Sequence, residues 1–117
     1  MATLTTAKLE LAGKSGKKYS FSIYPIDEEC KDESGIYAFT KRMKENDGSF
    51  THYVIYIGKA KSFETRFYDH HKDDCIDKKG ANCLCLMKVS AESDREEYEK
   101  DLIRGQNPPC NEVHRTN

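Results

Sequence analysis

Alternation of hydrophobic and polar residues predicts two strands near the start of the chain. In the stretch 18–25 (KYSFSIYP), Tyr19, Phe21 and Ile23 occupy every second position, which is the period of a strand with one buried face. The stretch 8–11 (KLEL) has a similar character, and the segment between the two contains two glycines that suit a turn. We therefore expect an N-terminal β-hairpin.

A second pair of strands is predicted in the middle of the chain. The stretches 35–40 (GIYAFT) and 52–58 (HYVIYIG) are rich in β-branched and aromatic residues, which favour strands. Between them lies Asp47-Gly48, a dipeptide typical of tight turns. These features predict an antiparallel hairpin.

The remaining chain predicts two helices around one more strand. Ser62 is suited to cap a helix that runs to about Lys72, and a polar loop is expected over 75–82. The apolar run 83–89 is short enough for a central strand. The order β-β-β-β-α-β-α predicts an α+β fold, with a small, mostly antiparallel sheet flanked by helices.

The second helix has sequence signals at both of its ends. Ser93 and Glu96 form a capping-box pattern. Gly105, followed by Pro108 and Pro109, is a typical stop signal. We therefore expect this helix to begin at Ser93 and to end at Gly105.

Length and composition indicate one polar domain. The chain has 117 residues, of which 37% are hydrophobic and 33% are charged, and its length suits a single domain. No apolar run approaches the roughly 18 residues of a membrane span, and the first residues do not resemble a secretory leader. These features predict a cytoplasmic protein that does not enter a membrane. The net charge of −1 is unusual for a nucleic-acid-binding protein, although the basic residues are concentrated in the first two thirds of the chain.

The five cysteines allow two interpretations. An odd number in a chain without a leader favours reduced thiols over a disulfide framework. A zinc site is the alternative, and its candidate ligands are Cys75, Cys83, Cys85, His70 and His71. The spacing suits zinc poorly, because the C-x-C pair at 83 and 85 fits two residues on one face of a strand better.

Two tripeptides, Gly35-Ile36-Tyr37 and Tyr56-Ile57-Gly58, lie on the paired middle strands. Their tyrosines can project from adjacent strands on the same face. In isolation, each tyrosine is explained by ordinary sheet packing. The two tripeptides are followed, however, by an ordered set of polar residues.

With these tripeptides the chain resembles the GIY-YIG nuclease superfamily, which includes the N-terminal cutting domain of a bacterial excinuclease and intron-encoded homing endonucleases. The resemblance extends from Gly35 to Asn111. It includes an E-x-x-L-I pattern that starts at Glu99 and a P-x-x-N ending that starts at Pro108. The matching candidate site residues, in chain order, are Tyr37, Tyr56, Lys59, Arg66, His70, Glu99 and Asn111.

The resemblance implies an endonuclease that hydrolyses phosphodiester bonds, with DNA favoured over RNA, and one Mg²⁺ or Mn²⁺ ion held by Glu99. A single carboxylate with several waters suits Mg²⁺. Arg66 can bind phosphate oxygens with its planar guanidinium group. His70 titrates near neutral pH and lies one helical turn after Arg66, so it can take a proton from Tyr37 or from water. Tyr56 and Lys59 would position the water or the phosphate.

Each of these residues also has an ordinary structural interpretation. Without the family pattern, Glu99 is a solvated carboxylate among other acidic residues of its helix, Arg66 is a surface arginine, and Lys59 is a charged turn residue. Asn111 is expected to hold the site together through the hydrogen bonds of its side-chain amide.

Three departures from the family pattern bear on substrate choice. The segment between Tyr37 and Tyr56 is longer than usual, residues 1–34 form an extra N-terminal hairpin ahead of a core at 35–111 and a tail at 112–117, and no separate DNA-binding domain follows. A homodimer, or a partner protein that supplies targeting, would compensate for the missing DNA-binding domain. The alternative function is a catalytically degenerate GIY-YIG fold that binds nucleic acid or protein.

Overall fold

The computed structural model describes residues 8–26, 29–64 and 74–111, in which five strands form one antiparallel sheet. The strands are β1 (Lys8–Ala12), β2 (Lys18–Pro25), β3 (Gly35–Lys44), β4 (Phe50–Ala60) and β5 (Cys83–Lys88), in the spatial order β1-β2-β5-β3-β4. The described helices are α2 (Asp74–Lys78) and α3 (Glu92–Gln106). The predicted α+β class with an antiparallel sheet is confirmed. No described helix is both long and apolar enough to cross a membrane.

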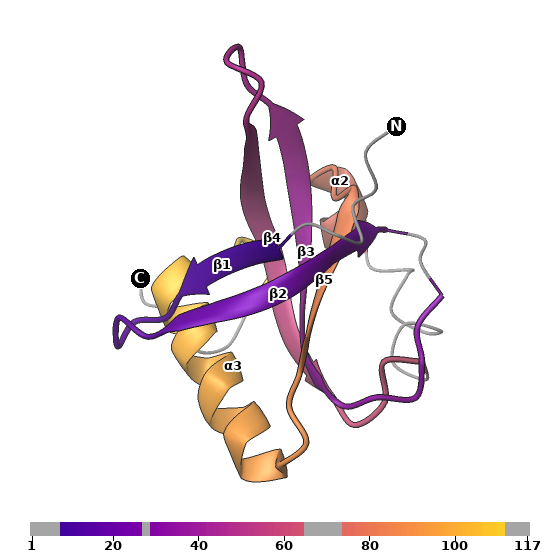
Figure 1. Ribbon diagram of the computed structural model, residues 1–117, viewed down its shortest axis with the longest axis vertical. Coiled ribbons are helices and arrows are strands. Elements are labelled where there is room, and N and C mark those ends of the chain that lie inside the picture. Colours follow the sequence, from indigo (N-terminus) through magenta and orange to yellow (C-terminus); the bar gives the residue numbers. More distant parts are fainter. Residues whose placement is uncertain (1–7, 27–28, 65–73, 112–117) are drawn as a thin grey trace.

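The sheet is strongly twisted, so that the β1–β2 hairpin crosses the direction of β3 and β4 at a steep angle (Figure 1). Both predicted hairpins are present, and β5 lies at the centre of the sheet as expected. Strand β2 pairs with β5 from Ser22 to Pro25. The N-terminal hairpin therefore extends the central sheet directly and is not an appendage to it.

Two hydrophobic clusters cover the two faces of the sheet, because neighbouring residues of a strand point to opposite sides. One cluster joins the sheet to α3, and its members include Phe21, Ile36, Ile57, Cys85, Leu102 and Ile103. The other lies on the opposite face, and its members include Tyr37, Phe39, Phe63, Ile76 and Leu84. We call these the α3 face and the tyrosine face.

The first turn of α3 is held by an arginine. The predicted capping box at residues 93–96 is wrong: the helix begins at residue 92, and Ala91, in the capping position, offers no side-chain bond. Instead, buried Arg95 donates from Nη1 to the carbonyls of Val89, at 3.1 Å, and Ser90, at 2.8 Å. These bonds fix α3 to the segment that leaves β5, and tertiary contacts of this kind leave no local sequence signal.

The end of α3 also differs from the expectation. Gly105 lies inside the helix, and Asn107 adopts the left-handed conformation that ends it, with φ of 49°. A Cβ at Gly105 would lie only 2.5 Å from the carbonyl carbon of Gly13 and 2.6 Å from the nitrogen of Lys14. Gly105 is therefore required where the helix backbone packs against the β1–β2 turn.

A disulfide joins Cys75 of α2 to Cys110, which follows α3. The expectation of reduced thiols is thus wrong for this pair, as is the expectation of a continuous loop over 75–82, whose first residues belong to α2. The two cysteines are 35 residues apart in sequence, yet their Cα atoms are 5.8 Å apart. Only the packing of α2 against the chain after α3 brings them together.

The disulfide also bears on the zinc alternative, because Cys75 cannot supply a thiolate while it is bonded. Cys83 and Cys85 are buried on the α3 face of β5, which confirms the prediction made from their spacing. His70 and His71, the remaining candidate ligands, lie outside the described residues.

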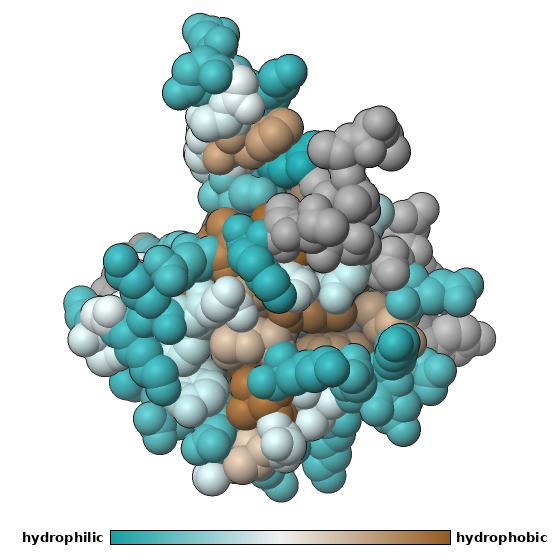
Figure 2. Space-filling model, viewed as in Figure 1, coloured by the Kyte–Doolittle hydropathy of each residue, from teal (hydrophilic) through white to brown (hydrophobic). Residues whose placement is uncertain are grey.

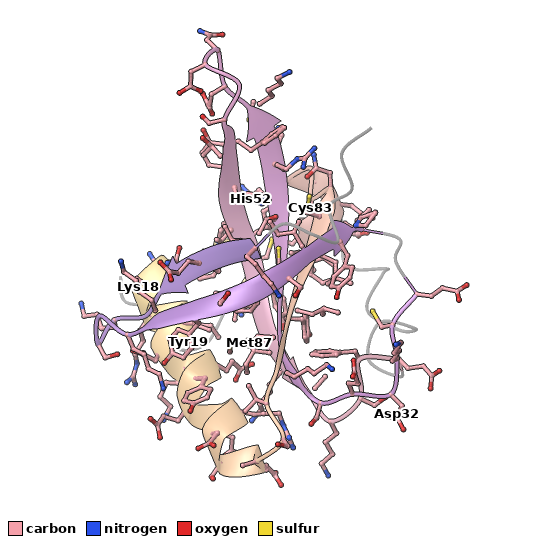
Figure 3. The ribbon with its side chains drawn as sticks, in the orientation of Figure 1. Lys18, Tyr19, Asp32, His52, Cys83 and Met87 are labelled. Carbon is pink, nitrogen blue, oxygen red and sulfur yellow. A yellow bond between two sulfur atoms is a disulfide. The ribbon has the colours of Figure 1, made fainter. Side chains whose placement is uncertain are left out.

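Asp101 fastens the β1–β2 turn to α3. Its carboxylate accepts hydrogen bonds from the Ser15 backbone N–H at 2.9 Å, the Ser15 hydroxyl at 2.7 Å and the Tyr19 hydroxyl at 2.8 Å. Tyr19 lies between β2 and α3 (Figure 3), with its ring 5.2 Å from that of Tyr98. Burial, together with the bond to Asp101 and its charge, raises the pKa of Tyr19 well above its ordinary value.

This network predicts an acid-sensitive contribution to stability. Burial acts most strongly on Asp101 and raises its pKa, but the hydrogen bonds from Ser15, Tyr19 and Lys14 together outweigh it, so the pKa lies below the ordinary 3.8. A carboxylate with a depressed folded-state pKa stabilises the protein above its unfolded-state pKa, and this contribution is lost as the pH falls through the folded-state value. We expect Asp101→Asn to lower the free energy of unfolding at pH 7 and to flatten its dependence on pH below about 4. Urea unfolding at several pH values measures both; parallel curves for the two proteins would contradict the prediction.

Candidate functional site

The two tyrosines of the tripeptides form a pair on the tyrosine face. Tyr37 lies opposite Gly58, and Phe39 lies opposite Tyr56. The rings of Tyr37 and Tyr56 are 6.0 Å apart between centroids and tilted by 32°. The expectation that they share a face is confirmed. Tyr37 is fully buried, whereas Tyr56 is partly exposed.

The glycine of the second tripeptide makes room for the tyrosine of the first. A Cβ at Gly58 would lie 2.5 Å from Cζ of Tyr37, far inside van der Waals contact. Only glycine lets the Tyr37 ring lie across β4. The two tripeptides are therefore interlocking parts of one packing arrangement, which explains their joint occurrence in physical terms.

A β-bulge in β4 sets which side chains follow the tyrosine pair along the strands. Phe39 pairs with Tyr56 and Thr40 pairs with Val54, so Ile55 is the extra residue. Ile55 and Tyr56 both contact the cluster of the tyrosine face. Beyond the bulge the alternation of β4 is shifted by one position in sequence, so that Tyr53, opposite Lys41, faces the same side as Tyr56.

Asn111 binds the backbone of β4 at its free edge, beside the tyrosine pair. Its Oδ1 accepts the backbone N–H of Ile57 at 2.9 Å, and its Nδ2 donates to the Ile57 carbonyl at 2.8 Å. The neighbouring Cys110 N–H donates to the carbonyl of Ile55 at 3.0 Å. Asn111 is 5% exposed, so its amide completes the hydrogen bonding of an edge strand in place of a sixth strand. These are the side-chain hydrogen bonds that the sequence predicts for Asn111.

Lys59 connects the end of β4 to α3. It lies opposite Ile36 and so belongs to the α3 face, and its Nζ is 3.4 Å from Oε1 of Glu96. Glu96 was not singled out as a site residue from the sequence, because the pairing exists only once α3 lies along β4. Glu99 follows Glu96 by one turn and is partly buried.

The structure thus divides the predicted site residues of the described chain between the two sides of the sheet. Tyr37 and Tyr56 share the tyrosine face. Lys59 and Glu99 belong to the layer of α3, which packs mainly on β4, the edge strand. A common centre would have to form around the free edge of β4. Arg66 and His70, which follow β4 along the chain, lie outside the described residues.

Glu99 lies on a helix that is fastened at both ends, by Arg95 at its first turn and by Asp101 near its last. A metal-binding carboxylate benefits from such a fixed position. The described residues contain no group of three or more His, Cys, Asp or Glu side chains suited to a metal. A site with one protein carboxylate and several waters, as Mg²⁺ accepts, is compatible with Glu99; a site built from several protein ligands has no counterpart in the described part.

His52 is the one histidine within the described residues. Its Nδ1 lies 2.9 Å from Oγ1 of Thr40. Burial, and to a lesser degree the charge of Arg42, lowers its pKa. His52 thus stays neutral at physiological pH and satisfies the buried Thr40 hydroxyl, which is a structural role.

Comparisons with known proteins give no independent assignment: no family model, no curated protein and no solved structure matches the chain. A functional assignment therefore depends on the residues themselves and on their arrangement.

Proposed function

We propose that the protein is a metal-dependent endonuclease of the GIY-YIG type, which hydrolyses phosphodiester bonds with DNA as its favoured substrate. The main support is the interlocked pair Tyr37 and Tyr56, which stands beside a strand edge that Asn111 holds in place. Ordinary packing accounts for a buried tyrosine, but not for the polar residues that follow the pair in the order of that family.

In this proposal the two phenols act on the attacking water. Tyr37 takes the proton of that water as its own phenol proton passes to His70, while Tyr56 orients the water or the phosphate. A phenol with a pKa near 10 needs a nearby positive charge to act as a base. Arg66 supplies this charge and also binds the phosphate oxygens in the transition state, while Lys59, on the α3 face, positions the phosphate.

Glu99 is the residue that would hold a Mg²⁺ or Mn²⁺ ion. Such an ion, when bound, stabilises negative charge on the phosphate and on the leaving oxygen. Glu99 lies on a helix that Arg95 and Asp101 fix to the rest of the protein, and Lys59 pairs with Glu96, one helical turn before Glu99. A single centre of this kind cuts one strand at a time, so double-strand cleavage would need a homodimer or two successive events.

Cleavage of a substrate panel tests the proposal. The panel contains supercoiled plasmid, linear duplex, branched DNA and RNA, each incubated with Mg²⁺, with Mn²⁺ and with EDTA. We expect at least one DNA substrate to be cut, and to be cut only when metal is present. The alternative is a catalytically degenerate module that binds nucleic acid or protein, which would bind without cutting under every one of these conditions.

Replacement of Tyr37 by phenylalanine should lower the cleavage rate about a hundredfold, because general base catalysis contributes on the order of 10² to 10⁴. Phenylalanine keeps the ring that packs over Gly58, so the fold should persist, which circular dichroism can verify. Tyr24→Phe, on a different strand, is the matched control and should cut normally. Near-full cleavage by folded Tyr37→Phe would exclude Tyr37 as the base.

A further inference from the structure

The β3–β4 hairpin projects well beyond the rest of the sheet (Figure 1). Its end is hydrophilic, with more hydrophobic residues where it meets the body of the protein (Figure 2). Met43, Phe50 and Tyr53 are exposed on it to 43%, 49% and 53%. Large side chains on an exposed hairpin are costly for a protein without a partner, and exposed aromatic residues often mark binding surfaces.

One side of this hairpin continues the tyrosine face, because the bulge adds a residue to β4 without exchanging its sides. Along β3, the residues Tyr37, Phe39, Lys41 and Met43 alternate onto the same side. On β4, Tyr53 lies opposite Lys41, so it shares that side. A continuous strip of side chains therefore runs from the Tyr37–Tyr56 pair outward to Met43 and Tyr53.

An open groove of about 570 Å³ lies beside this strip along the free edge of β4, and the residues that line it include Lys41, Met43, Tyr53, Ile55 and Lys79, together with His52, Val54 and Gln106. A Cβ at Gly80 would lie 3.5 Å from Cδ and 3.7 Å from Nζ of Lys41, so the Lys41 side chain lies close to the turn that contains Lys79. Among the residues that the structure describes, neither lysine forms an ion pair and no carboxylate lines the groove. In a chain with a net charge of −1, a groove whose charged side chains, as far as the structure describes them, are both positive is a local exception.

We infer that this groove binds the sugar–phosphate backbone of a nucleic-acid strand, with Tyr53 stacking against a base. The chemistry on each side is complementary: the two lysine ammonium groups match phosphates, and an exposed aromatic ring is the usual platform for an unpaired or terminal base. The inference builds on the proposed nuclease function, because the strip leads directly from the tyrosine pair and would guide the strand to it. It assigns to the elongated hairpin a role in holding the substrate.

Binding can be measured apart from cleavage by fluorescence anisotropy of short labelled single-stranded and duplex DNA, in EDTA, over a range of salt concentrations. We expect Lys41→Gln/Lys79→Gln to weaken binding about tenfold and to reduce the slope of log K against log salt by roughly 1.5 to 2. The matched control, Lys14→Gln/Lys18→Gln, makes the same charge change at the β1–β2 turn and should leave the midpoint and the slope almost unchanged. Equal effects of the two double variants would overturn the inference.

Variants of Tyr53 distinguish stacking against a base from electrostatic attraction to phosphates. Tyr53→Ala should weaken binding of the single strand about tenfold, whereas Tyr53→Phe, which keeps the ring, should bind like the wild type. Wild-type affinity in Tyr53→Ala would overturn the stacking role.

The outcomes for the groove and for the nuclease can be told apart. If the wild type cuts DNA but all groove variants bind DNA with wild-type affinity, the groove is excluded as the binding site and the nuclease proposal is retained. If no substrate is cut but nucleic-acid binding depends on Lys41, Lys79 and Tyr53, the nuclease proposal is rejected and the inference that the groove binds nucleic acid is retained. If wild type binds no nucleic acid even at low salt, the groove inference is overturned, and a protein partner becomes the occupant to seek.

Discussion

Glu99→Gln is expected to reduce metal-dependent DNA cleavage about a thousandfold, the largest effect on activity of any single replacement in the proposed site. Glutamine has nearly the same shape as glutamate but no charge, so it removes the negative ligand that a divalent ion needs while it preserves the helix. Arg95 and Asp101 fasten α3 on either side of Glu99, and thus the replacement should leave the fold intact.

The control for this experiment lies on the same helix. Glu97 is exposed and borders a hollow beside Tyr19 and Asp101, away from β4. Glu97→Gln makes the same chemical change and should cut at close to the wild-type rate. Cleavage by Glu99→Gln at the wild-type rate would remove Glu99 from the site, and an equal loss in both variants would point to a general effect on α3.

Removal of the Cys75–Cys110 disulfide is expected to have the largest effect on stability. The bond closes a segment of 35 residues, and a loop of that length restricts the unfolded chain by about 4 kcal/mol. For a domain of this size, Cys75→Ala/Cys110→Ala should lower the melting temperature by about 10–20 °C. Differential scanning calorimetry in a buffer that contains neither oxidant nor reductant measures the shift.

The wild-type protein supplies the internal control for the disulfide. Addition of a phosphine reductant should lower the melting temperature of the wild type and have no further effect on the double variant. A wild type that melts at the same temperature with and without reductant would contradict the prediction. Thiol titration of the denatured protein also decides between this bond and the fully reduced cysteines that the sequence predicts for a cytoplasmic protein.

The sequence was a good guide to the sheet and a poor guide to the contacts between its layers. Period-two patterns located β2 to the residue, because the core faces one side of that strand along its whole length. The sequence predicts the ends of α3 wrongly, because tertiary contacts determine them. Arg95 donates a hydrogen bond to the Val89 carbonyl, and Gly105 packs against the β1–β2 turn. The local helix propensity of a segment does not depend on residues that are distant in sequence, so it cannot predict these contacts.

The candidate site shows the same division. The tyrosine pair follows from strand pairing, which the Asp47-Gly48 turn indicates, and the amide bonds of Asn111 follow its predicted role. The link between Lys59 and Glu96 was missed because it joins segments 37 positions apart. The bulge at Ile55 was missed as well, because one extra residue in a strand leaves no mark in composition or turn signals.

The extra residue at position 55 shifts the outer half of β4 by one position in sequence without exchanging its sides. Tyr56 and Val54 lie opposite the consecutive residues Phe39 and Thr40, so they face opposite sides of the sheet although they are two positions apart. Deletion of Ile55 would therefore restore a regular ladder and leave Tyr53 opposite Lys41, with only the local bend and twist of the strand changed. Insertion of paired residues at the tip would likewise lengthen the hairpin and keep the same surface beside the tyrosines.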